Sequence, residues 1–488
     1  MHSLTAFLAF FAVFINDASN QVTNTEYRLN YHVQPEQGWA NDPNGPIHWN
    51  NQYHLFYQHY PNSSSPDWSD MHWGHVVSPD LVHWKYLPIA LTPDQHYDKN
   101  GCWSGSAVDD NGTLTLIYTG YVQLNSSTSW QNQNIATSKD GVTFTKYEKN
   151  PVIKTWPIDG SDNFRDPNVW KHKEIWYMVV GNQNVNNRGR VVLYKSKDLR
   201  NWGYVGVLAS SETLGTMWEM PDFFELDGKF VLIVNPQNLP RDDYNYVSLQ
   251  SAGYFVGDYD YETNIFKHGP YHEVDLGHDF VETRTFFDQS TNRRMIFGWM
   301  GMWDAYFPEK NDGWAGAHTI PRELHLNENG KLTMTPVAEL KLLRENQIYN
   351  SRILVSEQFD TGIPLNSTEL FINIPIDKLK ADKAGFTFTC MQNVAAGWGQ
   401  FRVYYDKKRE KIVSTRIKDQ READWKGASE ISLHIYVDRS SIEIFVNGGI
   451  TFTSRFYVPW LPTLTLFTEN GQAEVDVQAY SLKNIWKN

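Results

Sequence analysis

The sequence predicts an all-β protein in which an N-terminal five-bladed β-propeller is followed by a C-terminal β-sandwich. Three observations predict this fold class. Apolar strand pairs recur at a nearly constant spacing through the first two thirds of the chain. A serine–aspartate–aromatic pattern recurs there with the same period. The period then ends, and alternating strand patterns without it fill the last third.

The repeating unit is a β-hairpin whose second strand is strongly apolar. These second strands begin at Tyr53, Leu114, Ile175, Phe230 and Met295. The intervals are 61, 61, 55 and 65 residues. Asn, Asp and Gly before each strand are typical of tight turns. Fixed spacing of this kind marks propellers and solenoids, and a propeller blade usually has four strands. We therefore predict five blades over residues 25–336.

The second pattern is a serine followed two residues later by aspartate and six residues later by an aromatic residue. It starts at Ser78, Ser138 and Ser196, so its spacing is 60 and 58 residues. We interpret it as a corner of the blade, with the aromatic ring packed between sheets, rather than as a chemical site.

A different organisation is predicted for the last third of the chain. Three apolar residues at helical spacing predict a linker helix within residues 337–350. Alternating apolar residues then predict a β-sandwich over residues 351–488. We expect the acids of this domain, such as Asp438 and Glu443, to be solvated rather than catalytic.

The N-terminus, residues 1–19, is predicted to be a secretory signal peptide. Its apolar run, from Leu4 to Ile15, is shorter than the span of about 20 residues that crosses a bilayer. Four sequons for N-glycosylation fit secretion, at Asn62, Asn111, Asn125 and Asn366. We therefore expect a soluble, secreted glycoprotein with no membrane partner.

Composition narrows the function classes further. The net charge of −13 disfavours nucleic acid and anionic membranes, whose binding depends on Lys and Arg. Aromatic residues reach 15%, which suits stacking against sugar rings, although most of them must pack between blades. Cys102 and Cys390 have no metal-site spacing. A disulfide between them is possible, but a chain of 488 residues does not need one.

Three acidic residues occupy equivalent positions in the repeat. Asp42, Asp166 and Glu219 precede the second strands of their hairpins by 11, 9 and 11 residues. Ser104 precedes its own strand by 10 residues. In a propeller these positions lie at or near the innermost strand, which lines the central axis. Each acid alone could be a turn residue or, beside Arg165, half of an ion pair. Together they predict a pocket of carboxyl groups, the machinery of glycoside hydrolysis.

The neighbours of the three acids predict different roles for them. Asp42 lies in a turn of Asn, Asp and Gly, whose N–H groups favour the ionised form that a nucleophile needs. Glu219 has bulky apolar neighbours, which raise the proton affinity that a general acid needs. Asp166 lies beside Arg165 and is expected to stay ionised, so that it stabilises a positively charged transition state.

Several segments resemble, in order, the signature of glycoside hydrolase family 32, the family of invertases, inulinases and related β-fructofuranosidases. They are WANDPNG, FYQ, WSGSAV, FRDP, WEMPDF and FGW. A further segment, DRSSIEIFVNGG, resembles the C-terminal motif of the family. The resemblance covers essentially the whole chain after the leader. It implies a catalytic five-bladed propeller followed by a β-sandwich.

The resemblance also implies roles for the residues at matching positions. Asp42 would be the nucleophile, Glu219 the acid/base and Asp166 the transition-state stabiliser. The residues implied to line the sugar site are Asn41, Asn44, Gln58, Trp68, Trp103, Ser104, Arg165 and Trp299. Ala40 and Met220 depart from the residues that the family often has there, which affects the pocket shape and the pKa of the acid.

We therefore expect a retaining β-fructofuranosidase that cleaves sucrose to glucose and fructose through a covalent fructosyl-enzyme, without cofactor or metal. A fructan hydrolase or a fructosyltransferase would use the same three acids. An inverting propeller glycosidase would need a wider gap between carboxyl groups. A non-catalytic sugar-binding propeller is the alternative from another class, and it is expected to have lost at least one acid. The sequence leaves the oligomeric state open.

Overall fold

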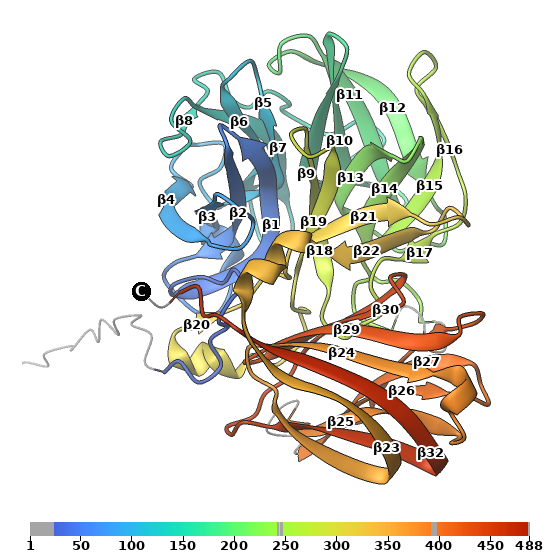
Figure 1. Cartoon of the computed structure of the whole chain (residues 1–488). Coiled ribbons are helices and arrows are strands. Elements are labelled where there is room, and N and C mark those ends of the chain that lie inside the picture. Colours follow the sequence, from blue (N-terminus) through green and yellow to red (C-terminus); the bar gives the residue numbers. More distant parts are fainter. Residues whose placement is uncertain (1–23, 242–243, 245–246, 392–397, 487–488) are drawn as a thin grey trace, which may run out of the picture.

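The computed structural model describes residues 24–241, 244, 247–391 and 398–486. The predicted signal peptide, residues 1–19, lies outside these ranges. Figure 1 shows a ring of sheets from the first two thirds of the chain, with a second β-rich body beneath it. Within the described ranges every helix is a short 3₁₀ helix. The predicted all-β class, a five-bladed propeller followed by a β-sandwich, is confirmed.

Five sheets form the blades of the propeller. The strands of the first blade are β20 (Trp314–Ala315), β1 (Gly38–Trp49), β2 (Gln52–Tyr60), β3 (His72–Ser78) and β4 (Lys85–Leu91). Those of the second are β5 (Cys102–Asp109), β6 (Leu114–Gln123), β7 (Ser129–Ser138) and β8 (Thr145–Lys146). Those of the third are β9 (Gly160–His172), β10 (Ile175–Asn184), β11 (Gly189–Ser196) and β12 (Trp202–Ser210).

The last two blades continue the same up-and-down order. The strands of the fourth are β13 (Trp218–Leu226), β14 (Lys229–Pro236), β15 (Gly253–Asp260), β16 (Ile265–His268) and β17 (His272–Glu273). Those of the fifth are β18 (Val281–Asp288), β19 (Arg293–Trp299), β21 (Arg322–Leu326) and β22 (Leu332–Pro336). Strand β20 follows β19 in the chain but pairs in parallel with β1, so it ties the end of the propeller back to the first blade.

The serine–aspartate–aromatic pattern forms a corner in each of the first three blades. In the first blade the Asp80 carboxylate accepts hydrogen bonds from the N–H groups of Val82, at 3.0 Å, and His83, at 2.8 Å. The Trp84 ring then packs edge-on against Phe297 of the fifth blade, with ring centroids 6.0 Å apart. Asp140 accepts the corresponding N–H bonds in the second blade. The packing interpretation of this pattern is therefore confirmed.

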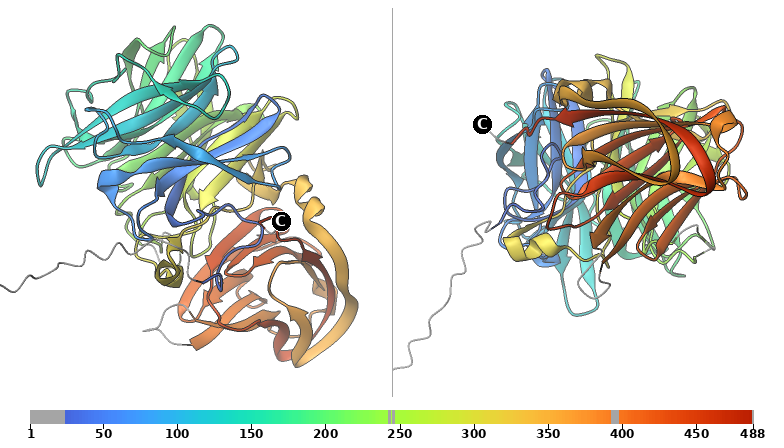
Figure 2. Two further views of the ribbon diagram at one scale, coloured as in Figure 1. Left: turned by 90° about the vertical axis from the view of Figure 1, so that its left-hand side faces the viewer. Right: turned by 60° about the horizontal axis from the view of Figure 1, so that its bottom comes forward.

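Two long strands organise the C-terminal domain. They are β23 (Arg344–Pro364) and β32 (Thr463–Leu482), which pair with each other. The other strands are β24 (Thr368–Pro375), β25 (Lys383–Met391), β26 (Trp398–Asp406), β27 (Lys411–Arg416), β28 (Asp419–Asp424), β29 (Glu430–Asp438), β30 (Ser441–Val446) and β31 (Ile450–Arg455). The first half of β32 pairs with β25 and its second half with β24, so the two layers of the sandwich are continuous through it. Figure 2 shows the two layers curving around a shared interior.

The link between the domains is shorter than the helix predicted over residues 337–350. A 3₁₀ helix, η3 (Ala338–Leu343), is followed directly by β23. The apolar residues that predicted it, Val337, Leu340 and Leu343, are three residues apart and buried. A spacing of three matches the 3₁₀ helix, which has three residues per turn. The other 3₁₀ helices are η1 (Trp68–Asp70), η2 (Pro308–Asp312) and η4 (Ile376–Lys378).

A buried polar network joins the two domains. His32 bridges two acids of the sandwich, with Nδ1 2.8 Å from Asp438 Oδ2 and Nε2 2.8 Å from Glu443 Oε1. Arg322 of the fifth blade reaches Glu443 Oε2 and, at 2.9 Å, Asp275 Oδ2. All these side chains are fully buried, so the prediction that Asp438 and Glu443 are solvated is wrong. They hold the sandwich against the propeller.

Two smaller features complete the fold. Cys102 and Cys390 are both buried and unpaired, one in β5 of the propeller and one in β25 of the sandwich. In the described part of the chain, no helix has the length and apolarity needed to cross a membrane.

Candidate active site

A β-bulge interrupts the first strand of every blade. The register shifts lie between Ala40 and Pro43, Trp103 and Gly105, Arg165 and Asn168, Glu219 and Asp222, and Val281 and Arg284. The acids and the serine at these shifts are Asp42, Ser104, Asp166, Glu219 and Glu282. A bulge bends its strand and re-aims a side chain. The five bulges therefore turn equivalent side chains toward the same region of the propeller axis.

Contacts between neighbouring blades fix these bulges. Asp166, Met220 and Glu282 have φ angles of 66°, 46° and 52°, in the left-handed region that is unfavourable for residues other than glycine. The N–H of Asp166 donates to Thr119 Oγ1 at 3.0 Å, and that of Met220 donates to Asp166 Oδ2 at 3.0 Å. The N–H of Glu282 donates to Asn235 Oδ1 at 2.9 Å. Each strained residue is thus held by the blade before it.

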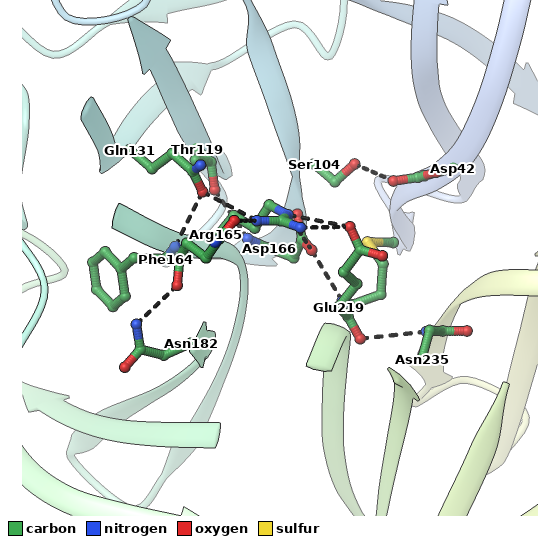
Figure 3. A network of polar contacts seen from close by, with 12 residues as sticks. Asp42, Ser104, Thr119, Gln131, Phe164, Arg165, Asp166, Asn182, Glu219 and Asn235 are labelled. Carbon is green, nitrogen blue, oxygen red and sulfur yellow. Dashed lines mark hydrogen bonds and ion pairs between the residues drawn. The ribbon is translucent and has the colours of Figure 1, made fainter. Parts of the chain in front are cut away.

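The bulges surround a cavity of 330 Å³. It is lined by Asn41, Asp42, Gln58, Trp68, Trp103, Ser104, Arg165, Asp166, Glu219, Gln237, Gln250, Glu282 and Trp303. Figure 3 shows Asp42, Asp166 and Glu219 converging from three different blades. The structure therefore brings the three predicted acids into one pocket, although 177 residues separate the first from the last.

Asp42 is buried, and side chains hold both of its carboxylate oxygens. Ser104 Oγ donates to Oδ2 at 2.6 Å, and Asn41 Nδ2 donates to Oδ1 at 2.8 Å. These bonds favour the ionised form, but burial outweighs them and raises the pKa of Asp42 to about 6. The sequence argument, which counted the turn N–H donors and not the burial, predicted the opposite direction.

Arg165 lies between Asp166 and Glu219, and its contact with Glu219 is the shorter one. Its Nη2 is 2.7 Å from Glu219 Oε1, whereas its Nε is 3.9 Å from Asp166 Oδ2. Gln250 Nε2 donates to the other oxygen of Glu219. Burial raises the pKa of Asp166 to about 7, and Arg165 offsets only part of that rise. The pKa of Asp166 is therefore raised, whereas the contact with Arg165 alone predicted that it would be lowered.

Other predicted sugar-site residues form the walls and the mouth of the pocket. Gln58 Nε2 donates to the Cys102 carbonyl at 3.0 Å, which fixes its amide in the wall. The Trp103 ring stacks on Tyr121, with centroids 3.9 Å apart. Trp68 is 43% exposed at the mouth and meets Trp303 edge-on at 4.8 Å. Aromatic faces at the mouth suit the apolar C–H face of a sugar.

Two residues that the resemblance placed at the sugar site do not line the cavity. Asn44 is fully buried, and its Oδ1 accepts the N–H of Gly105 at 3.2 Å, so it ties the first blade to the second. Trp299 is also fully buried and packs against Trp303, with centroids 4.5 Å apart. Trp303 contacts the cavity in its place.

Four lining residues were missed from the sequence. Gln237, Gln250 and Trp303 lie outside the first strands, so the repeat gave no signal for them. Glu282 did have a signal, because it belongs to the first strand of the fifth blade. It precedes the apolar strand at Met295 by 13 residues, which is longer than the corresponding spacing in the other blades. The spacing is longer because the loop of its hairpin spans residues 289–292, whereas the loop of the first blade spans only residues 50–51.

Comparison with known proteins agrees with this geometry. Residues 32–336 match the Glycosyl hydrolases family 32 N-terminal domain, and residues 339–483 match the Glycosyl hydrolases family 32 C terminal domain. A sucrose-6-phosphate hydrolase of Zymomonas mobilis is 38% identical over 89% of this chain and 86% of its own length. A raffinose invertase of Escherichia coli is 35% identical over 92% of this chain and 94% of its own.

Solved structures give the same picture. The Bombyx mori GH32 beta-fructofuranosidase BmSUC1 superposes with a TM-score of 0.84 at 35% identity, over 95% of both chains. A mutant of that enzyme in complex with sucrose superposes equally well. The chain therefore belongs to glycoside hydrolase family 32 and is a glycosidase of the β-fructofuranosidase type.

Proposed function

We propose that the protein hydrolyses terminal β-D-fructofuranosides with retention of configuration, and that sucrose is its main substrate. The observation that carries this proposal is the single small cavity that Asp42, Asp166 and Glu219 share. A retaining glycosidase needs a nucleophilic carboxylate and an acid/base carboxyl group on the same glycosidic centre.

The contacts in the pocket support the division of labour between the acids. Asp42 attacks the anomeric carbon of the fructosyl unit, and Ser104 and Asn41 orient its two oxygens for that attack. Glu219 protonates the departing oxygen and then takes a proton from the water that releases fructose. Arg165 and Gln250 hold the Glu219 carboxyl group in place between these two steps. Asp166 contacts sugar hydroxyls and stabilises the positive charge of the transition state.

The charge of the pocket supports sucrose over a phosphorylated sugar. Several curated relatives are sucrose-6-phosphate hydrolases. In this chain Arg165 is the one cationic side chain among the described residues that line the cavity, and Glu219 already pairs with it. No other cationic side chain among the described lining residues is free to bind a phosphate dianion.

The test is a comparison of kcat/KM for sucrose, sucrose-6-phosphate, raffinose, inulin and levan under one set of conditions. We expect the highest value for sucrose and release of glucose and fructose in equal amounts. A higher value for sucrose-6-phosphate would overturn the preference. A higher value for inulin or levan would identify a fructan hydrolase, and transfer products in place of free fructose would identify a fructosyltransferase.

We also propose that the protein is secreted and glycosylated. The apolar N-terminal run supports export. Three of the four sequon asparagines, Asn62, Asn111 and Asn125, are exposed, whereas Asn366 is half-buried. Expression of the full chain in a eukaryotic secretory host tests this. We expect protein in the medium whose mobility increases on enzymatic removal of N-glycans, and retention of unmodified protein inside the cells would contradict it.

A further inference from the structure

We propose that Glu282 is a fourth acidic residue of the active site, which binds a hydroxyl group of the fructosyl unit and determines specificity for it. The proposal rests on the proposed fructofuranosidase function. Glu282 lies on β18, at the bulge of the fifth blade. It lines the same cavity as Asp42, Asp166 and Glu219. The propeller therefore presents an acid from four of its five blades, and not from three.

The backbone of Glu282 is held in the same way as that of Asp166, with a positive φ and an N–H bonded to the preceding blade. Its φ of 52° is unfavourable for a glutamate, and strain of this kind concentrates at functional sites. Asn235 of the fourth blade holds it, because Asn235 Oδ1 accepts the Glu282 N–H at 2.9 Å. Asn235 Nδ2 also donates to the Glu219 carbonyl at 3.4 Å. One amide side chain thus sets the relative positions of Glu282 and Glu219.

The side chain of Glu282 lacks the partners that a structural glutamate would have. Within the described part of the chain it forms no ion pair, and its Oε2 is buried without a hydrogen bond. By contrast, the structural acid Glu443 is bonded by both His32 and Arg322. A buried polar atom without a partner is costly, so this carboxyl group is expected to be satisfied by a bound ligand.

The position of Glu282 deep in the cavity determines which sugar of the substrate it contacts. Glu282 is 2% exposed, whereas Trp68 at the mouth is 43% exposed. In an enzyme that removes terminal units, the fructosyl ring occupies the inner end of the pocket and the leaving sugar lies toward the mouth. Glu282 therefore contacts the fructosyl ring, and its contribution is independent of the leaving group.

The charges around Glu282 determine the form in which it binds. Asp42 on β1, Asp166 on β9 and Glu219 on β13 all oppose its ionisation. Arg165 on β9 favours the ionised form but pairs with Glu219. Arg284, on the same strand as Glu282, donates to the Pro221 carbonyl at 2.7 Å.

Burial and the three carboxylates together raise the pKa of Glu282 well above its usual value. A neutral carboxylic acid both donates and accepts hydrogen bonds, and a sugar hydroxyl does the same. The neutral form of Glu282 is thus complementary to the group that we propose it binds.

The test compares Glu282→Gln with Glu282→Ala, because glutamine keeps one donor and one acceptor in the same place. We expect Glu282→Gln to keep kcat/KM for sucrose within about threefold of the wild type, since one hydrogen-bond pair is exchanged for another. It should also lose less activity than the wild type at alkaline pH, because the amide does not ionise. Glu282→Ala should lose about 10- to 100-fold in kcat/KM, by the same factor for sucrose and raffinose.

A matched control is Glu225→Gln, which changes an exposed glutamate on the first strand of the fourth blade and should leave kinetics unchanged. Thermal unfolding checks that each variant folds. If Glu282→Ala does not fold, the kinetics of Glu282→Gln still test the proposal. The proposal would be overturned if Glu282→Ala kept the kcat/KM of the wild type. It would also be overturned if Glu282→Gln lost as much kcat/KM as Glu282→Ala and its alkaline limb did not shift.

A readout independent of turnover separates this proposal from the proposed function. Calorimetry of fructose binding should show an affinity at least about tenfold weaker in Glu282→Ala than in the wild type. In a pH series, the infrared difference between wild type and Glu282→Gln should show the band of the protonated Glu282 carboxyl group persisting to higher pH than that of a free glutamate. A wild-type protein without activity on any β-fructofuranoside contradicts the proposed function alone, whereas equal fructose affinities contradict the role of Glu282.

Discussion

Arg165 forms its hydrogen-bonded ion pair with Glu219 of the next blade and makes only a longer contact with Asp166, its neighbour in sequence. Its Nη2 is 2.7 Å from Glu219 Oε1, and its Nε is 3.2 Å from the same oxygen. Asp166 Oδ2 lies 3.9 Å from Nε, outside hydrogen-bond distance. The arginine of the third blade thus positions the acid/base of the fourth before any substrate binds.

Replacement of this arginine tests its positioning role. Arg165→Lys keeps the charge but loses the planar group that contacts one oxygen through two nitrogens. We expect kcat/KM for sucrose to fall about 10- to 100-fold, which corresponds to about 1.4–2.7 kcal/mol. The control is Arg188→Lys, an exposed arginine before β11. An Arg165→Lys enzyme with wild-type kcat/KM would show that the ion pair is dispensable.

Replacement of the nucleophile and replacement of the acid/base should have different kinetic effects. Asp42→Ala removes the nucleophile, so we expect kcat for sucrose to fall roughly 10⁴-fold. Glu219→Ala should cost about as much with sucrose, but much less with an activated aryl β-fructofuranoside, whose leaving group needs no proton. Azide should accelerate the Glu219 variant because it attacks without a general base. Rescue of Asp42→Ala and not of Glu219→Ala would reverse the assignment.

The acid limb of the pH profile should report the ionisation of Asp42 and Asp166. Their pKa values are about 6 and about 7, and both act as carboxylates, so kcat/KM should decrease as the pH falls below about 7 and more steeply below about 6. Ser104→Ala removes a donor that favours the ionised form. The limb should therefore move to higher pH in this variant, as measured by initial rates between pH 4 and about 8. A limb that moved to lower pH would contradict the role of this bond.

The buried bridge at His32 should make stability depend on pH. Burial lowers the pKa of His32, but the hydrogen bonds and charges of Asp438 and Glu443 outweigh it and raise the pKa above its usual value in the folded protein. A raised folded-state pKa gives stabilisation that is complete below the unfolded value of about 6.5 and is lost as the pH rises through the folded value. His32→Gln should therefore lower the free energy of unfolding by about 3–5 kcal/mol at pH 6 and by less at pH 9.

Denaturant unfolding of both proteins at the two pH values measures this difference. Glu443 has a lowered pKa in the folded state, so its own contribution is lost toward acid pH, below the range compared. An equal loss of stability at pH 6 and pH 9 would show that His32 is not charged in the folded protein.

Repetition in the sequence was enough to predict the fold and the meeting of the acids. The spacing of Asp42, Asp166 and Glu219 from their apolar strands depends only on the period of the blade. The ion-pair partner of Arg165 and the pKa values of the acids could not be predicted from the repeat. Arg165 reaches Glu219 through a contact between blades, and the pKa values of Asp42 and Asp166 follow from burial that no local pattern records.

Residues with a purely local signal were assigned less well. Asn44 follows Asp42 by two residues, but it lies beyond the bulge between Ala40 and Pro43 and its side chain joins two blades. Trp303 and Gln250 come from loops that follow no period, so only the folded chain shows that they line the cavity. The η3 helix shows the same limit, because a spacing of three fits both helix types until the length is known.

The most direct test of the mechanism is to trap the fructosyl-enzyme. Glu219→Ala would be mixed with an activated aryl β-fructofuranoside, quenched in acid during turnover and digested for peptide mass spectrometry. Because this variant forms the intermediate faster than it hydrolyses it, we expect one fructosyl unit on the peptide that contains Asp42. Turnover without any adduct, or an adduct on a different carboxylate, would contradict the central claim that Asp42 is the nucleophile.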